Sequence, residues 1–360
     1  MNSQKKYWNI EYNQSFSVSF EYPVHFTRNL FSQDNSLLLD VLNRLDENRC
    51  HRAAVYIDSG VNYAHKFLLP QIKAYFKTHA GKAELTSEPK IIPGGETAKD
   101  GWDLVKNLIT EISSMHLDRQ SYIIAIGGGA VLDMIGFAAA IVHRGLRLIR
   151  IPTTTLAQND AGIGVKNSIN DQAQKNFIGT FAPPFAVIND SGFLKTLSHE
   201  QWIGGISEAF KVSIIKDRGF FNFLIDNALE FKNRNILAME EAVYRCAYLH
   251  LEHIRKNGDP FEFGSARPLD FGHWAAHKLE NMSNYKIGHG QAVAIGIALD
   301  SYVAQDQGLI SKDELEQIIQ GFISCGFPIW NELLKQKNKD GSLEIIKGLE
   351  EFREHLGGQL

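Results

Sequence analysis

Three histidines lie close together in the chain, in a pattern that could bind a metal ion. His273 and His277 stand four residues apart in R-P-L-D-F-G-H-W-A-A-H-K-L-E (267–280), and His289 follows in G-H-G-Q-A (288–292). Residues four apart share one face of a helix, so the first two imidazoles can point into the same cleft. A catalytic zinc ion takes three protein ligands and leaves one position for water or substrate. The spacing therefore predicts a metal site; the alternative is that each imidazole only satisfies hydrogen bonds in the core.

A glutamate in an apolar segment is a candidate for a further ligand. Glu208 lies in G-G-I-S-E-A-F-K (204–211), and Lys211 follows it one helical turn later. Charged side chains are rarely buried without a partner. Burial of Glu208 would therefore require the lysine, a metal ion or both.

A strand, three glycines and a helix follow one another in Y-I-I-A-I-G-G-G-A-V-L-D (122–133). Glycines at the start of a helix leave its backbone N–H groups open to an anion. Open α/β sheets bind dinucleotides at the carboxyl ends of their strands, so this turn predicts a pyrophosphate site. A tight turn without a ligand is the alternative, because the G-x-G-x-x-G spacing is not present. The three glycines are Gly127, Gly128 and Gly129.

Two further polar segments could contact a nucleotide or a phosphate. The turn I-I-P-G-G-E-T-A-K (91–99) offers Glu96 and Lys99 to a ribose or phosphate, with a capped helix start as the alternative. The segment 151–184 is rich in small, hydroxyl and charged residues, which predicts a binding loop rather than a simple crossover. Cationic and amide groups suit phosphate oxygens, and the alternative for each lysine is a solvated surface charge. The candidates in and near this segment are Arg144, Lys166, Lys175 and Asn176.

The elements that must position these residues differ between the two halves of the chain. Short β-branched runs alternate with helical patterns from 13 to 190, which predicts a doubly wound, Rossmann-like α/β domain with a parallel sheet. Its strands are expected at 53–58, 122–126, 148–152 and 185–190, and its helices at 60–80 and 98–116. Residues 191–360 are expected to form a mainly helical domain. Its long amphipathic segments are 238–256, 271–284, 290–306 and 312–324.

Composition and charge exclude several classes of protein. The 360 residues are 44% hydrophobic and 22% charged with a formal net charge of −4, which fits a globular protein of two domains and not a nucleic-acid binder. The polar start has no apolar signal region, and no apolar stretch approaches the roughly 18 residues of a membrane span. Cys50, Cys246 and Cys325 are odd in number and far apart. No disulfide framework is expected, and a cytoplasmic location fits.

Several motifs in a fixed order resemble the 3-dehydroquinate synthase superfamily of sugar phosphate cyclases. They lie between about 50 and 330 and read G-G-G-x-x-x-D-x-x-G-F-x-A-A, R-G, P-T-T-x-L-A-Q-x-D, K-x-x-I-N, K-N, E-A-F-K, G-H-x-x-x-H and G-H-G-Q-A-V-A. The resemblance implies an NAD-binding α/β domain that faces a helical metal-binding domain in a homodimer.

Matching motif positions imply a role for individual residues. The implied ligands of a divalent metal, zinc first and cobalt as an alternative, are Glu208, His273 and His289. His277 is then not a ligand but handles a proton or phosphate at the substrate, and the implied catalytic set is His277, Lys211, Asp160 and Lys166. The implied NAD contacts are Asp58, Glu96, Lys99, Gly127, Gly128, Gly129, Asp133, Thr153, Thr154, Lys175 and Thr196. The implied substrate contacts are Lys166, Asn176, Glu262, Arg267, Asp270 and Arg144, the last of which reaches a neighbouring subunit.

The resemblance also implies a reaction. NAD oxidises a secondary alcohol of a sugar phosphate while the metal polarises its oxygen. The new ketone acidifies the neighbouring C–H, phosphate is eliminated, the hydride returns, and the resulting enol closes onto a carbonyl to form a six-membered carbocycle. NAD is recycled in each turnover.

Departures from the family pattern concern the substrate. In dehydroquinate synthases the motif R-x-x-L-N-x-G-H precedes the metal site, whereas Asp270 replaces the asparagine here and Arg267 is displaced by one position. Val165 stands where those enzymes have a second glycine, and Glu252 stands near the place of a family lysine. Like charges repel, so a substrate with hydroxyls at that end fits Asp270 better than a carboxylate.

Three classes of function remain open from the sequence. The first is a cyclase, either dehydroquinate synthase-like or of the 2-deoxy-scyllo-inosose or valiolone type. The second is a metal-dependent polyol or glycerol dehydrogenase, and the third is a non-catalytic relative with the same fold. The retained His277 argues against the valiolone type, which usually lacks that histidine.

Overall fold

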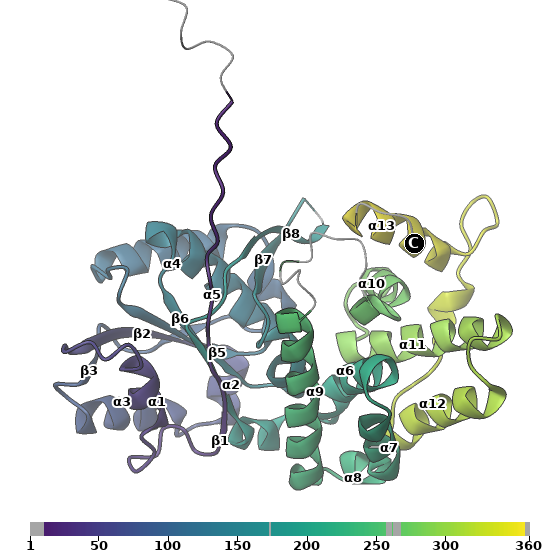
Figure 1. Ribbon diagram of the computed structural model, residues 1–360, viewed down its shortest axis with the longest axis horizontal. Coiled ribbons are helices and arrows are strands. Elements are labelled where there is room, and N and C mark those ends of the chain that lie inside the picture. Colours follow the sequence, from purple (N-terminus) through teal and green to yellow (C-terminus); the bar gives the residue numbers. More distant parts are fainter. Residues whose placement is uncertain (1–10, 173, 257–260, 262–267, 357–360) are drawn as a thin grey trace, which may run out of the picture.

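The computed structural model describes residues 11–172, 174–256, 261 and 268–356, and the side chains through residue 353. A sheet with helices on both faces lies beside a bundle of helices (Figure 1). The fold is the expected one, with an α/β part first in the chain and a helical part after it.

The central sheet has seven parallel strands in the order β1-β9-β6-β5-β2-β3, with β4 also paired to β2. The four predicted strands are its inner members, where both faces are covered and the sequence is almost continuously apolar. The strands are β1 (Val24–Thr27), β2 (His51–Asp58), β3 (Ala83–Leu85), β4 (Lys90–Ile92), β5 (Tyr122–Gly127), β6 (Arg147–Pro152) and β9 (Ala186–Asp190).

Helices cover the two faces of this sheet. Alternate side chains of β2 point to opposite faces, so Val55 and Ile57 pack in one apolar core and Tyr56 packs in the other. The first core includes α1 (Leu37–Leu42) and α3 (Leu68–Thr78), while the second includes α4 (Asp103–Ser114) and α5 (Gly129–Ile141). Short helices α2 (Ser59–Ala64), η1 (Glu96–Lys99), η2 (Val142–Arg144) and η4 (Ser191–Thr196) follow strands or helices at the ends of the sheet.

The segment 151–184 is only partly the loop that the sequence predicts. A single π-helical turn, η3 (Ala157–Ala161), is followed by an antiparallel hairpin of β7 (Lys166–Asp171) and β8 (Gln174–Phe181). The strands escaped prediction because K-N-S-I-N-D and its partner are polar and lack a strong β-branched alternation. The fully buried Arg150 shapes this segment by donating to the carbonyls of Gly162 at 3.1 Å and Gly164 at 2.8 Å. It also donates to the Lys166 carbonyl at 3.0 Å and to Asn167 Oδ1 at 2.6 Å.

The helical part packs around α6 (His199–Lys216). Trp202, Phe210 and Phe322 are fully buried in its core. The other helices are α7 (Arg218–Asp226), α8 (Ala228–Lys232), α9 (Ile236–Lys256), η5 (Pro268–Asp270), α10 (His273–Met282), α11 (His289–Asp306), α12 (Lys312–Cys325), η6 (Glu332–Lys335), η7 (Glu344–Ile346) and α13 (Lys347–Leu356). The four predicted amphipathic segments correspond to α9, α10, α11 and α12. Within the described ranges, no helix is both long and apolar enough to cross a membrane.

The first residues of α10 pack closely against α11 through a contact between two glycines. Gly272 adopts a left-handed conformation, with φ of 78°, directly before His273. A Cβ atom on Gly296 would lie 1.9 Å from the carbonyl oxygen of Gly272, so the two backbones touch. Neither position tolerates a side chain, and this contact fixes where α10 begins.

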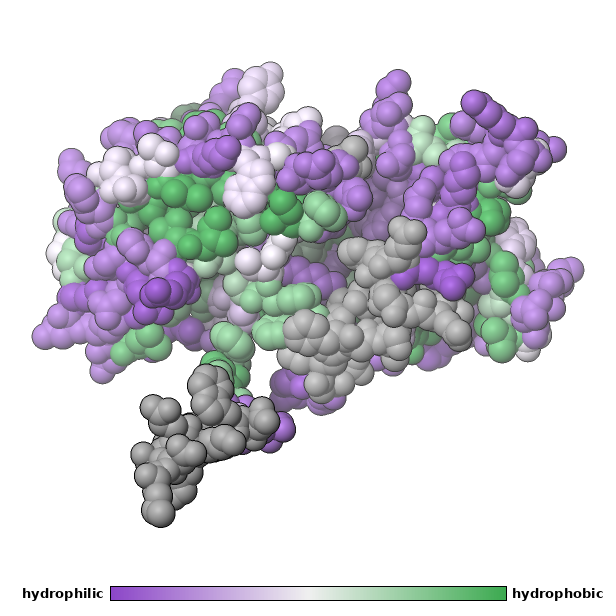
Figure 2. Space-filling view, turned by 90° about the horizontal axis from the view of Figure 1, so that it is seen from above, coloured by the Kyte–Doolittle hydropathy of each residue, from purple (hydrophilic) through white to green (hydrophobic). Residues whose placement is uncertain are grey.

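Residues 11–21 leave the body of the molecule as an extended segment (Figure 1). Apolar and polar residues alternate along it, and Tyr12, Phe16, Val18 and Phe20 are all more than half exposed. Figure 2 shows hydrophobic side chains gathered over the half of the molecule that holds the sheet, with hydrophilic side chains around them.

Candidate active site

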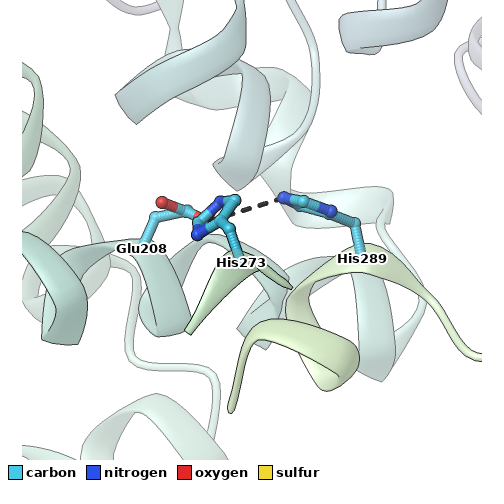
Figure 3. Close-up of side chains that lie close together, drawn as sticks. All are labelled: Glu208, His273 and His289. Carbon is cyan, nitrogen blue, oxygen red and sulfur yellow. Dashed lines mark ion pairs between the residues drawn. The ribbon is translucent and has the colours of Figure 1, made fainter. Parts of the chain in front are cut away.

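Glu208, His273 and His289 come together from three helices, α6, α10 and α11 (Figure 3). Glu208 Oε1 lies 3.5 Å from Nε2 of each histidine, and the three potential ligand atoms lie within 4.8 Å of one another. Two ligands held about 2.0–2.1 Å from a zinc ion at tetrahedral angles are about 3.4 Å apart. The separation therefore suits a shared metal ion better than direct hydrogen bonds, which weaken steeply at this length.

The outer ring nitrogens of both histidines also suit a metal centre. His273 Nδ1 lies 3.2 Å from the Phe271 carbonyl oxygen, and His289 Nδ1 lies 3.2 Å from Glu280 Oε2. Both neighbours are acceptors, so each Nδ1 carries the proton and each Nε2 presents a lone pair towards Glu208. Histidines that bind metals are usually held by such an outer hydrogen bond. The donor set and its orientation fit a divalent metal.

Neighbouring charges shift the pKa values of the residues in this site. Burial acts to raise the pKa of Glu208, but Lys211, His273 and His289 outweigh it, so the pKa lies well below its ordinary value. Lys211 Nζ pairs with Glu208 Oε2 one turn along α6, as the sequence predicts. Burial, followed by the charge of Lys211, lowers the pKa of His273 well below its ordinary value. Burial also acts to lower the pKa of His289, but the Glu280 charge and the carboxylates of Glu208 and Glu280 beside its ring raise it to about 9.

His277 lies beside the three candidate ligands without belonging to the group of Glu208. Its ring is 5.5 Å from that of His273 and 6.1 Å from that of His289. It also belongs to a second close group with Glu280 and His289. The structure thus brings His273, His277 and His289 together, but only His273 and His289 lie in the group that contains Glu208.

Asp160 joins the loop after β6 to the helical part. Its Oδ1 atom lies 3.2 Å from Nδ1 of His250, which projects from α9. Burial acts to lower the pKa of both Lys211 and His250, and the Asp160 charge opposes it in each case. The Lys166 charge also acts to lower the pKa of His250. The predicted catalytic residues Asp160, Lys166 and Lys211 therefore lie near one another, beside the candidate metal ligands.

Predicted cofactor residues meet at the carboxyl edge of the sheet. Asp58 ends β2 and accepts a hydrogen bond of 2.7 Å from Gly60 N. Gly94 lies so close that a Cβ atom there would be 2.1 Å from Asp58 Oδ1. Gly127 ends β5, and its carbonyl accepts a hydrogen bond of 3.0 Å from Thr153 N, at the end of β6. The glycine turn and the threonines after β6 are thus neighbours.

The same edge has features that suit a bound dinucleotide. Gly128 caps α5, and a Cβ atom on it would meet only Thr154 Cγ2, at 3.4 Å, so the backbone there is approachable. The hydroxyl of Thr153 is buried and has no hydrogen-bond partner among the described residues. Buried polar groups normally have partners. An open glycine turn beside such a hydroxyl fits a polar ligand.

Lys99 is the centre of a second cluster at this edge. Its buried Nζ donates to Asp133 Oδ2 at 2.7 Å, to Ser168 Oγ at 3.0 Å and to Asn176 Oδ1. Glu96 lies beside this cluster and accepts a hydrogen bond of 3.1 Å from Asn170. Lys175, next to Asn176 on β8, makes an ion pair of 2.9 Å with Glu280 on α10. The hairpin thus links the sheet edge to the candidate metal centre.

The remaining predicted site residues are Thr196, Arg144, Asp270, Glu262 and Arg267. The Thr196 hydroxyl is 2.7 Å from His65 Nε2. Arg144 is exposed after α5 with a left-handed φ of 65°. Asp270 lies in η5, just before α10. Glu262 and Arg267 lie outside the described residues.

Three functional candidates were not predicted from the sequence. His250 comes from the same helix as Glu252, but Glu252 pairs with Arg255 and Lys256, whereas His250 faces Asp160. Glu280 is buried and joins His289 to Lys175. Arg150 fixes the backbone before β7 through its hydrogen bonds to the carbonyls of Gly162 and Gly164. For Glu280, the spacing of three residues after His277 was a usable signal, since it places the carboxylate on the same helix face.

Comparison with known proteins gives one consistent family. The family described as 3-dehydroquinate synthase N-terminal matches residues 90–204, and the one described as 3-dehydroquinate synthase C-terminal matches residues 205–348. The 3-dehydroquinate synthase of Campylobacter fetus is 38% identical over 238 residues, which span 66% of this chain and 67% of that protein. The 3-dehydroquinate synthase of Geotalea uraniireducens is 33% identical over 301 residues, which span 83% of this chain and 79% of that protein.

A solved structure agrees with these relatives. It is the 2-epi-5-epi-valiolone synthase from Streptomyces hygroscopicus subsp. jinggangensis, determined with NAD⁺ and Zn²⁺ bound. The TM-score is 0.83 at 26% identity, with 96% of this chain and 90% of that chain covered.

Proposed function

The chain belongs to the 3-dehydroquinate synthase family, and from that premise we propose that it is a carbon–oxygen lyase that eliminates phosphate from a sugar phosphate and closes the product into a carbocycle. The proposed cofactors are NAD and a divalent metal, with zinc first and cobalt as the alternative. The valiolone synthase relative carries NAD⁺ and Zn²⁺, which supports this assignment.

One observation carries the proposal: a continuous set of contacts runs between the two candidate sites. Lys99 binds Asp133 and Asn176 at the sheet edge. Lys175, the residue before Asn176, pairs with Glu280, which in turn contacts the metal-ligand candidate His289. A reaction that uses a redox cofactor and a metal on one substrate requires such adjacency.

Each group has a distinct proposed role. Glu208, His273 and His289 would hold the metal, which supplies Lewis acidity to a substrate oxygen when bound. The edge at Asp58, Gly127, Gly128, Gly129, Thr153 and Thr154 would hold NAD, which accepts and returns a hydride. Lys211 neutralises Glu208, and its ammonium group also interacts with the charge of Asp160. Lys166 and Asn176 provide the cationic and amide donors that suit phosphate oxygens.

The proposal also covers the domain organisation, the location and the oligomeric state of the protein. Residues 13–190 form the cofactor domain and residues 191–360 the metal- and substrate-binding domain. The protein acts in the cytoplasm as a homodimer, in which Arg144 reaches the neighbouring site. The exposed, alternating apolar residues of 11–21 are consistent with coverage by a second subunit. Light scattering is expected to give twice the 40.4 kDa chain mass, and a monomer would contradict this part.

Phosphate release tests the reaction directly. Purified protein with NAD and zinc or cobalt would be offered a carboxylate-bearing seven-carbon sugar phosphate, sedoheptulose 7-phosphate and glucose 6-phosphate. We expect phosphate release from one of them without net NADH, because the hydride returns in each turnover. Asp270 favours the substrates without a carboxylate. Net NADH production from a polyol would instead indicate a dehydrogenase, and no phosphate release from any substrate would refute the cyclase.

His277→Ala is expected to spare the metal and slow turnover. Loss of a positioned acid–base group typically costs about 10²–10⁴ in rate, and His277 lies beside rather than within the Glu208 group. Turnover and metal content after dialysis would be compared with those of His199→Ala, which removes an exposed histidine at the start of α6. Loss of metal from the His277 variant would show that the ligand set is wrong.

A further inference from the structure

Glu280 is a buried carboxylate with two partners from different parts of the molecule. Its side chain projects from α10 and the residue is 4% exposed. Oε2 lies 3.2 Å from His289 Nδ1 on α11, and Oε1 lies 2.9 Å from Lys175 Nζ on β8. A buried charge is tolerated only when it is paired and hydrogen-bonded. Both oxygens meet this requirement, one through the imidazole and the other through the lysine.

The contact with His289 has a direct consequence for metal binding. A carboxylate can only accept a hydrogen bond, so Nδ1 of His289 must carry a proton. Nε2 then presents its lone pair to the position beside Glu208 Oε1, 3.5 Å away. Without an acceptor at Nδ1, the imidazole ring could rotate about its Cβ–Cγ bond, or its proton could move to Nε2. His273 receives the same support from a backbone carbonyl, whereas His289 depends on a side chain.

We propose that Glu280 is a positioning residue that fixes the tautomer and the orientation of His289 for the metal, while Lys175 makes the burial of this carboxylate possible. This inference rests on the proposed metal site. Outer-shell partners of metal-binding histidines typically contribute 10–100-fold to metal affinity. The two contacts of Glu280 therefore have different roles, and variants of each can separate them.

Co²⁺ is a suitable probe, because its visible absorption reports ligand number and geometry independently of turnover. The full chain, stripped of metal, would be titrated with Co²⁺ as wild type, Glu280→Ala and Lys175→Met. We expect about 10–100-fold weaker Co²⁺ binding and an altered absorption spectrum for Glu280→Ala. Lys175→Met retains the acceptor for His289, so its loss of Co²⁺ affinity should be much smaller and its spectrum unchanged.

A matched control lies on the same helix. Lys278 on α10 is 7% exposed, and it pairs with Glu351 of α13 and with Glu344 rather than with a candidate ligand. Glu351→Gln removes that ion pair and should leave Co²⁺ affinity unchanged. If Glu280→Ala does not fold, Glu280→Gln takes its place, since the amide retains the shape and loses the charge, and a smaller loss with a changed spectrum is expected.

Two results would overturn the inference. Wild-type affinity and spectrum in the Glu280 variant would show that His289 needs no support from it. Equal losses in the Glu280 and Lys175 variants would show that the carboxylate only links the hairpin to α10. Failure of the wild-type protein to bind Co²⁺ is a different result, because it would remove the proposed metal site itself.

Discussion

Replacing Glu208 with alanine is expected to abolish metal retention and turnover. The carboxylate is the one candidate ligand with a full negative charge, and it lies between two histidines at 3.5 Å. Its removal also leaves Lys211 buried without its partner, so the site acquires net positive charge and repels a divalent cation. Loss of an outer-shell partner costs about 10–100-fold in metal affinity, and loss of a direct ligand should exceed about 100-fold.

Metal content after dialysis and phosphate release would measure these effects. Glu241→Ala removes an exposed glutamate from α9 and is the control, with wild-type metal content expected. His273→Ala should reproduce the Glu208 result. A Glu208 variant that retains stoichiometric metal would exclude this carboxylate as a ligand.

Gly296→Ala is expected to have the largest effect on stability of any single methyl group added near the site. The new Cβ atom would lie 1.9 Å from the Gly272 carbonyl oxygen, a backbone atom that cannot move alone. Overpacking in a core costs typically 1–3 kcal/mol and occasionally more, and a clash between two backbones belongs at the upper end, about 3 kcal/mol. Because Gly272 directly precedes His273, α10 must shift and metal affinity should fall with stability.

Denaturant unfolding of the metal-free protein would give the change in free energy of unfolding. Gly204→Ala is the control, because a Cβ atom at this helical glycine of α6 would meet no neighbouring atom within 4 Å. For Gly204→Ala, the free energy of unfolding should instead rise by up to about 1 kcal/mol, because alanine has a higher helix propensity than glycine. Equal stabilities of the two variants would mean that α10 and α11 are not held by the glycine contact.

The elements and residues that could be predicted from the sequence are those marked by a pattern within a short stretch of the chain. Inner strands such as β2 and β5 are apolar on both faces, and the three glycines stand directly after a strand. The cluster of candidate metal ligands could be predicted because His273 and His289 occur in short motifs and Glu208 interrupts an apolar run. By contrast, β7 and β8 are polar strands that are held by Arg150 and Lys99, contacts which no local pattern reveals.

His250 illustrates the same limit within the site. Helix α9 carries many polar residues, and nothing in its sequence distinguishes His250 from the nearby Glu252. Only the packing of α9 against the turn after β6 brings His250 to Asp160. Long-range contacts of this kind depend on tertiary structure, so the sequence indicates candidate site residues most readily where they cluster in the chain.

The buried Arg150 has a consequence for ligand affinity. Its guanidinium binds three backbone carbonyls between Gly162 and Lys166, so the conformational entropy of this stretch is lost when the protein folds. Ordering a residue costs about 1–2 kcal/mol in backbone entropy. A ligand that reaches Lys166 therefore meets a preorganised backbone, and more of its contact energy appears as affinity.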